Sequence, residues 1–244
     1  MAPTKLDKVR ASALPILTKT AHFSAPFITT FLLIHLSAPA LANIGGSSLS
    51  SRTMLLGREY YQTILSEPLL ILGPLTLHAV SGSLKRLLSP PGRPPRRLTH
   101  LLSITGYATL LLFLPVHYLT HRAYPTLDVA PIYAVGPAEL DYEFVKTGLK
   151  SWPIRSWLMY TGLVLSTTLH LVDGMTIIWN TYLKDFLPSW KLAKRPRRTA
   201  LALGCIALPT LTGLYAISKE PMMTFASMAS RYQAVFLSSM LYRI

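Results

Sequence analysis

Five apolar stretches constrain this chain more than any other feature, because each is long enough to cross about 30 Å of hydrocarbon. They are Phe23–Asn43, Leu65–Leu84, Leu98–Thr120, Trp157–Asn180 and Thr199–Ser218. Only 14% of the 244 residues are charged, whereas a soluble domain carries about a quarter charged residues. Backbone groups inside a bilayer must be satisfied within the chain, and helices achieve this. The sequence therefore predicts an all-α membrane bundle with five transmembrane helices.

These stretches divide the chain into five regions. A basic, amphipathic segment at 1–22 is expected to lie on the membrane surface. A first two-helix repeat at 23–97 and a second at 98–198 follow, and then a fifth transmembrane helix at 199–218 and a C-terminal tail at 219–244. We expect no separate soluble domain, because the loops between the spans are too short for one.

The positive charges lie mostly on one side of the predicted bundle. With five spans, the N-terminus shares a side with the loops after the second and fourth spans. We call this side A and the opposite one side B. Side A holds 15 of the 24 Lys and Arg residues, and side B holds seven of the ten acidic residues. Such a bias orients side A toward the compartment from which the protein is inserted. The basic loops also suit anionic lipid head groups or an acidic partner, whereas this apolar composition argues against a nucleic-acid-binding protein.

The chain contains an internal duplication. The segment TLHAVSG at 76–82 recurs as TLHLVDG at 168–174, with five of seven positions identical. A shorter likeness joins FLLIH at 31–35 to FLPVH at 113–117. The two helix pairs are thus expected to form a four-helix core, with the fifth helix outside the repeat.

The duplication pairs four histidines within the predicted spans. His78 and His170 lie toward side A, and His35 and His117 lie in the side B half of their spans. A histidine inside a bilayer is costly without a partner, and facing imidazoles on opposed helices can hold haem iron from both sides. The alternative for each histidine is a hydrogen bond across helices to Ser or Thr. His121, one turn after His117, is an alternative ligand at that position.

Three further residues share a helix face with the histidines near side A. Gly82 and Gly174 follow their histidines by four residues, so neither presents a side chain that would collide with a flat macrocycle. The alternative is close helix packing through small residues. Arg86 lies on the same face and could pair with a haem propionate, or it is a charge that sets orientation. We interpret Asp173 as a local hydrogen-bonding group, with proton relay or metal binding as the alternative.

No catalytic constellation is recognisable in the sequence. It lacks a glycine-rich phosphate loop, a nucleophile elbow and paired carboxylates within a span. The single cysteine, Cys205, excludes an internal disulfide framework and a cysteine-based zinc or iron–sulfur site. We therefore expect no enzyme that acts alone, and the metal that we expect is haem iron.

Two family resemblances rest on the repeated segments. The duplicated His-x-x-x-Gly spans resemble the membrane cytochrome b subunits of succinate dehydrogenase and fumarate reductase. This resemblance implies a cytochrome-b-like core with one or two b-type haems, held by His78 with His170 and by His35 with His117. Together with the basic side A loops and the overall layout, the two segments also resemble the Mdm-complementing protein family, which comprises fungal mitochondrial outer-membrane adaptors.

The adaptor resemblance implies a multi-pass protein of the mitochondrial outer membrane with a cytosolic N-terminus. It implies a role in lipid homeostasis at contact sites, with phospholipids and a bridge-like lipid-transfer protein as partners. In that family a Pro-x-Pro motif in the N-terminal tail recruits the transfer protein, and this sequence has no such motif.

Two alternative functions follow from the same residues. The first is a transmembrane electron-transfer protein with two haems, acting with a quinone and a soluble partner. The second is a haem-free lipid scramblase or conduit with polar helix faces. The residues of those faces are Thr29, Thr30, Ser166, Thr167 and Thr168.

Overall fold

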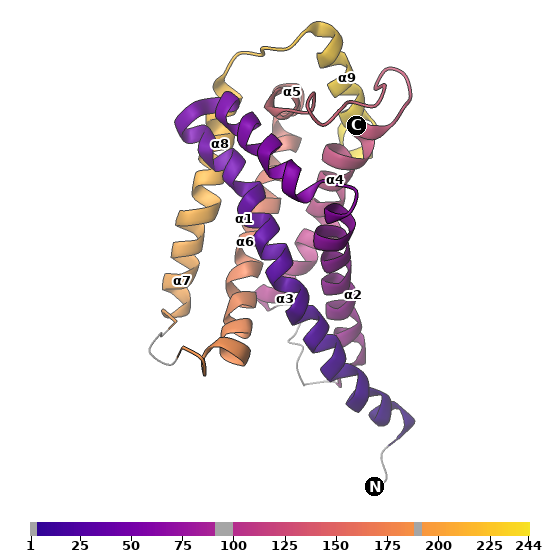
Figure 1. Ribbon diagram of the computed structural model, residues 1–244, viewed down its shortest axis with the longest axis vertical. Coiled ribbons are helices and arrows are strands. Elements are labelled where there is room, and N and C mark those ends of the chain that lie inside the picture. Colours follow the sequence, from indigo (N-terminus) through magenta and orange to yellow (C-terminus); the bar gives the residue numbers. More distant parts are fainter. Residues whose placement is uncertain (1–3, 91–99, 188–191) are drawn as a thin grey trace.

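The computed structural model describes residues 4–90, 100–187 and 192–244, and within these ranges the chain forms helices and no strand. The long helices run roughly along the long axis of the molecule (Figure 1). The Lys5 end of α1 and the C-terminus lie at opposite ends, which we identify with sides A and B. Four residues of the predicted basic side A loops lie outside the described residues: Arg93, Arg96, Arg97 and Lys191.

Helix α1 (Lys5–Tyr61) is 57 residues long and bends once. It begins at a capping box, in which the Thr4 side chain accepts from the Asp7 backbone N–H and Asp7 accepts from the Thr4 backbone N–H. The backbone leaves helical geometry only at Gly45 and Gly46. Gly46 has φ +58° and ψ −156°, a conformation that suits glycine. The glycines separate a first arm (5–44) from a second arm (47–61), which runs across the side B end (Figure 1).

The first arm contains the N-terminal segment that the sequence assigns to the membrane surface. A surface helix would have to bend before Phe23, but the backbone stays helical through Pro15 and Pro26. No loop residues separate the segment from the span. The structure thus shows one continuous helix through this segment and the first span, and its placement on the membrane surface stays a prediction.

The remaining helices follow in chain order, and several α-helices are interrupted by one turn of π-helix (η). They are η1 (Glu67–Leu72), α2 (Gly73–Leu88), α3 (Leu101–Ala108), η2 (Thr109–Phe113), α4 (Leu114–Tyr118), η3 (Leu119–Ala123), the 3₁₀ turn η4 (Tyr124–Thr126), α5 (Tyr142–Ser151), α6 (Pro153–Ile178), η5 (Trp179–Leu183), α7 (Arg195–Ala202), η6 (Leu203–Ala207), α8 (Leu208–Lys219), α9 (Ala226–Leu237) and α10 (Met240–Arg243).

Four helical segments of the described chain are long and apolar enough to cross a membrane: Lys5–Tyr61, Leu101–Thr126, Pro153–Leu183 and Arg195–Lys219. They contain the first, fourth and fifth predicted spans and the third from Leu101 onward, since positions 98 and 99 lie outside the described residues. The all-α fold and four of the five spans are thus confirmed as helices of suitable length and composition. The second stretch forms the helix Glu67–Leu88, which is not among the four. Its histidine, serines and prolines dilute its apolar character.

The π turns explain how prolines fit inside these helices. Proline lacks an N–H group, and its ring crowds the carbonyl four residues earlier. A π turn widens the helix to i→i+5 hydrogen bonds, as between the Gly73 N–H and the Pro68 carbonyl. Four of the π turns end two residues before a proline: Pro74, Pro115, Pro125 and Pro209.

The helices pack so that both halves of the duplication share one bundle. Helix α2 packs against α1, α3 against α6, and α8 against α1. Helices α1 and α8 approach closely, because a Cβ atom at Gly213 would lie only 1.8 Å from the Pro39 carbonyl oxygen. Large apolar side chains such as Leu33, Leu111 and Leu158 are more than half exposed on the outer faces. Exposed apolar surface of this extent is typical of a protein that meets lipid or a partner.

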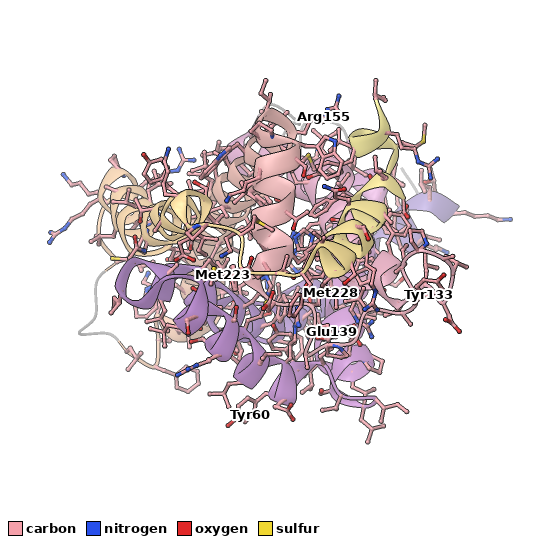
Figure 2. The ribbon with its side chains drawn as sticks, turned by 90° about the horizontal axis from the view of Figure 1, so that it is seen from above. Tyr60, Tyr133, Glu139, Arg155, Met223 and Met228 are labelled. Carbon is pink, nitrogen blue, oxygen red and sulfur yellow. The ribbon has the colours of Figure 1, made fainter. Side chains whose placement is uncertain are left out.

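A cluster of buried, mostly aromatic side chains lies at the side B end. It comprises Phe144, Tyr232, Val235, Phe236 and Tyr242, together with neighbours from the loop before α5. Figure 2 shows the molecule from this end, with Met223 and Met228 toward the middle and Tyr60, Tyr133 and Arg155 at the periphery.

Candidate functional site

The structure brings together His78 of α2 and His170 of α6, as the duplication predicts. Their ring centroids are 6.0 Å apart and the ring planes are nearly perpendicular, at 86°. Whether the pair could bind a cofactor depends on which ring nitrogens are free and on how much space surrounds the rings.

A main-chain carbonyl orients each ring of this pair. The His78 Nδ1 lies 2.9 Å from the Ala21 carbonyl oxygen, and the His170 Nδ1 lies 3.0 Å from the Leu102 carbonyl oxygen. The Ser24 hydroxyl lies 3.2 Å from the His78 Nδ1, so the alternative of a contact with a serine across helices is also present for this histidine. A carbonyl only accepts, so each Nδ1 carries the proton and each Nε2 keeps a lone pair. Metal-binding histidines use the same arrangement, which fixes the tautomer and makes the ligand more basic.

The carbonyl acceptors belong to the duplication as well. Ala21 lies 14 residues before His35, and Leu102 lies 15 residues before His117. The two halves therefore present their histidines to equivalent turns of equivalent helices. A comparison of the two repeats in sequence does not reveal this equivalence. The acceptor is a main-chain carbonyl, which every residue type provides.

The spacing of the two rings is that of an edge-to-face ring contact, and it also matches two ligands of one metal. Imidazole nitrogens lie about 2 Å from a bound metal, so two rings on opposite sides of one ion have centroids roughly 6 Å apart. Among the described residues, no group of three or more His, Cys, Asp or Glu side chains is placed to hold a metal ion. A histidine pair therefore suits a metal that brings its other ligands with it, as haem iron does.

Gly82 and Gly174 border open space. A Cβ atom added at either glycine would meet no atom within 4 Å. Gly106 of α3 differs, because its Cβ atom would lie 2.8 Å from the His170 ring. The space expected for a flat macrocycle is thus free of side chains at Gly82 and Gly174, whereas α3 presses closely on the ring of His170.

Arg86 is engaged by the neighbouring helix. Its guanidinium donates to the Ser103 hydroxyl at 2.5 Å and lies over the Tyr107 ring, 5.5 Å from the centroid. Its contact with a haem propionate stays a prediction, and the described contacts are with α3.

The second predicted pair also meets. The ring centroids of His35 and His117 are 5.9 Å apart, with an interplanar angle of 81°. The Tyr61 hydroxyl lies 3.4 Å from the His35 Nδ1. Along α3 and α4, 15 residues separate Leu102 from His117, or about 22 Å at 1.5 Å per residue. The molecule thus holds two histidine pairs at two depths.

His121 is the less suitable partner for His35. Its Nδ1 lies 2.8 Å from the Thr120 hydroxyl, and its Nε2 lies 3.0 Å from the Tyr160 hydroxyl. Both ring nitrogens therefore have partners. The His121 ring stacks on His117, with centroids 4.3 Å apart. The geometry favours His117, a choice that the sequence leaves open.

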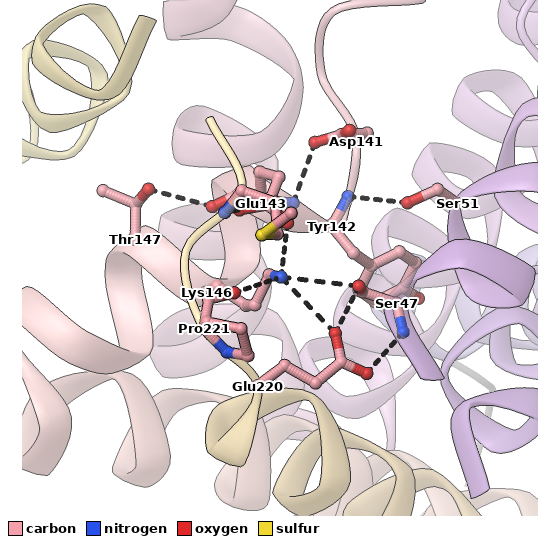
Figure 3. A network of polar contacts seen from close by, with 10 residues as sticks. Ser47, Ser51, Asp141, Tyr142, Glu143, Lys146, Thr147, Glu220 and Pro221 are labelled. Carbon is pink, nitrogen blue, oxygen red and sulfur yellow. Dashed lines mark hydrogen bonds and ion pairs between the residues drawn. The ribbon is translucent and has the colours of Figure 1, made fainter. Parts of the chain in front are cut away.

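A buried lysine on side B is the feature that sequence reasoning missed. Lys146 of α5 is completely buried and forms ion pairs with Glu143 and with Glu220, the latter at 3.4 Å (Figure 3). Its ammonium also donates to the Pro221 carbonyl at 2.9 Å. Lys146 therefore joins α5 to the segment that follows α8. The only sequence signal is the spacing of three residues between Glu143 and Lys146.

Glu220 connects this network to the bend in α1. The Ser47 backbone N–H donates to Glu220 at 2.9 Å, and the Ser47 hydroxyl donates to its other oxygen (Figure 3). The carboxylate thus satisfies an N–H group at the start of the second arm, where a negative charge is favourable. Burial raises the pKa of Glu220, but hydrogen bonds from Ser47 and Lys146 outweigh burial and lower it. The adjacent glycines Gly45 and Gly46 are the sequence signal for this bend.

Asp173 has an ion-pair partner, whereas the buried Thr168 hydroxyl has no hydrogen-bond partner among the described residues. Arg195 donates to both oxygens of Asp173, at 3.0 and 2.9 Å, which agrees with a hydrogen-bonding role.

Thr29, Thr167 and Thr168 line a cavity of about 150 Å³ between α1, α6 and η6. That volume corresponds to roughly five water molecules at ~30 Å³ each. Ser166 instead bonds to Thr109 at 2.8 Å, and Thr30 is exposed.

A comparison of the chain with protein-family models, with curated proteins and with solved structures finds no match. The two family resemblances therefore stay predictions. The paired histidines, their carbonyl acceptors and the open glycines are properties of the chain itself.

Proposed function

We propose that this protein is a membrane cytochrome-like protein that binds b-type haem between paired histidines. The observation that carries the proposal is the His78–His170 pair, 6.0 Å apart, with each Nδ1 directed at a main-chain carbonyl. The Nε2 atoms of these histidines would hold the iron, and His35 with His117 would hold a second haem. Bound haem would supply a reversible one-electron change.

The chain's own residues would position and isolate such a group. The carbonyls of Ala21 and Leu102 hold the two rings in the ligand tautomer, and Gly82 and Gly174 leave room beside them. The surrounding apolar helices limit access of water, which tunes any redox group. None of these steps needs a catalytic side chain, which fits the proposal that the protein is not an enzyme that acts alone.

We further propose that the helix Glu67–Leu88, the second of the predicted spans, also crosses the membrane and brings the number of spans to five. Its outer face is apolar, with Leu69, Leu77 and Leu87 more than half exposed. The helix packs along α1. At its side B end, Arg122 donates to both oxygens of Glu67 at 2.6 and 2.7 Å, so this carboxylate is paired.

The adaptor function extends this proposal to a cellular role. The resemblance in the repeated segments and the charge bias support a multi-pass protein of the mitochondrial outer membrane with a cytosolic N-terminus. Its role would be lipid homeostasis at contact sites, as an adaptor for a bridge-like lipid-transfer protein that would have to be recruited without a Pro-x-Pro motif.

Electron transfer between two haems is the second candidate, favoured by the two histidine pairs at different depths. The haem-free conduit receives less support. Three of its predicted polar residues line a cavity of about 150 Å³, which is small for a lipid head group.

An absorption spectrum of the purified protein tests the haem proposal. After expression with ample haem, we expect the bands of six-coordinate b haem on reduction with dithionite, and a pyridine haemochrome assay counts the haems. His78→Ala and His170→Ala should each remove one haem per chain, while His100→Ala, outside both pairs, should remove none.

The glycines provide a sharper control. Gly174→Leu should lower haem content, because the macrocycle would occupy the space beside it. Gly204→Leu should not, although a Cβ atom at Gly204 also meets no atom within 4 Å. A colourless wild-type protein, or haem content unaffected by the histidine variants, would contradict the proposal.

A further inference from the structure

A shallow cavity of about 470 Å³, wide open to its surroundings, lies at the side A end of the molecule, where residues 14–22 of α1 meet η5. Its lining residues are Leu14, Pro15, Thr18, Lys19, His22, Thr181 and Tyr182. His22 and Tyr182 join the two walls, with the His22 Nδ1 3.1 Å from the Tyr182 hydroxyl. Their rings also meet edge to face, with centroids 5.6 Å apart. The cavity is therefore built from two helices that are distant in the sequence.

The charge in and around this cavity is positive. Lys19 is an exposed lining residue, and the lining, which is mostly apolar, contains no carboxylate. Lys85 of α2 is close enough to act electrostatically on His22. Asp7, an acid on the same arm, is already bonded to Thr4. Lys19 and Lys85 therefore give this region positive charge, and the nearest acid along the chain from η5 is Asp185, three residues after the lining residue Tyr182.

The hydroxyl groups of the two lining threonines could accept a hydrogen bond from a ligand. The Thr18 hydroxyl donates to the Leu14 carbonyl at 2.8 Å, and the Thr181 hydroxyl donates to the Ile177 carbonyl at 2.7 Å. Each oxygen is left with lone pairs that only accept. A ligand with hydroxyl groups of its own would satisfy them. Leu14 and Pro15 add an apolar wall.

We propose that this cavity binds an anionic glycerophospholipid whose head group carries hydroxyls. Its phosphate would lie against Lys19 and its hydroxyls against the threonine oxygens. His22 directly precedes the first predicted span, so the cavity lies at the depth of the side A head groups. Basic pockets between transmembrane helices bind lipid head groups in this way. The inference rests on the membrane placement proposed above and is independent of haem.

Native mass spectrometry of the full, delipidated protein tests this site, with phosphatidylinositol as the titrated probe. We expect one tightly bound lipid per chain. Lys19→Gln should weaken binding about fivefold, the effect of removing one lysine charge near a lipid surface. The control is Lys184→Gln, an exposed lysine at the same end that is not part of the lining. It should change the affinity less than twofold.

Two further arms distinguish the source of the phosphate and the role of the hydroxyls. Soluble inositol 1-phosphate should not displace the lipid, and phosphatidic acid, which lacks head-group hydroxyls, should bind more weakly. Equal effects of the two lysine variants, or displacement by the soluble phosphate, would overturn the proposal. Lipid binding that persists in His78→Ala, together with loss of haem, would show that the two sites are independent.

Discussion

At the scale of single residues, orientation of the histidines depends on the main chain and on close helix contacts. The carbonyls of Ala21 and Leu102 direct His78 and His170, and no side-chain substitution removes either acceptor. Gly106 permits α3 to approach the His170 ring, because any larger residue would place a Cβ atom 2.8 Å from it. Backbone positions therefore determine much of the geometry of the pair, and the Ser24 hydroxyl, 3.2 Å from the His78 Nδ1, adds a side-chain contact.

The carboxylate of Glu220 makes the side B network sensitive to acid. Its pKa is lowered in the folded state, because hydrogen bonds from Ser47 and Lys146 outweigh the effect of burial. A lowered folded-state pKa contributes stability above the unfolded value, near 4.3 for glutamate, and this contribution is lost as the pH falls through the folded-state value. We expect the apparent Tm to decrease below about pH 4.3.

Glu220→Gln should lower the Tm at pH 7 and flatten this decrease, which thermal unfolding by fluorescence at several pH values would measure. Glu59→Gln, also on side B, serves as the control and should keep the wild-type profile. An unchanged acid profile in Glu220→Gln would show that other carboxylates cause the effect.

At the scale of secondary structure, the bend in α1 decides how the second arm crosses the side B end. Gly46→Ala would force an L residue into φ +58° and place its Cβ atom 2.2 Å from a Glu220 oxygen. Strain of this kind costs about 1–3 kcal/mol, and loss of the Ser47–Glu220 contacts would add to it. We expect the Tm to fall by several degrees.

Gly204→Ala is the matched control for the bend, because its Cβ atom would meet no atom within 4 Å. Alanine also favours helix over glycine by about 1 kcal/mol. This variant should be neutral or slightly more stable in the same thermal assay. A similar loss of stability in both variants would mean that the bend itself is not responsible.

The sequence predicts elements and pairings that depend on local or repeated patterns. Apolar length predicts the spans, and the repeated segments predict that His35 meets His117 and that His78 meets His170. The Lys146 network could not be predicted in this way, because it joins residues near positions 47, 146 and 220 that share no pattern. The continuity of the helix from Lys5 into the first span could not be predicted for another reason. An amphipathic segment suits a surface helix and a helix extension equally well, and only the backbone at 5–22 distinguishes them.

At the scale of the whole molecule, the number of spans determines where the two ends lie. The Lys5 end of α1 and the C-terminus lie at opposite ends of the molecule (Figure 1). An odd number of crossings requires this placement, and four crossings would return the chain to its starting side. Whether the chain crosses four or five times depends on the helix Glu67–Leu88, because the other four segments are long and apolar enough to cross.

Cysteine labelling of intact membranes can count the crossings. In a Cys205→Ser background, single cysteines replace Ser66 and Ser89, which flank the Glu67–Leu88 helix. We expect a membrane-impermeant maleimide to label Ser89→Cys from the side that holds the N-terminus, and Ser66→Cys only after the membrane is permeabilised. Tags at the N- and C-termini should likewise be accessible from opposite sides. Labelling of both cysteines from one side would mean that the helix does not cross, and the His78–His170 pair would then lie outside a four-helix membrane core.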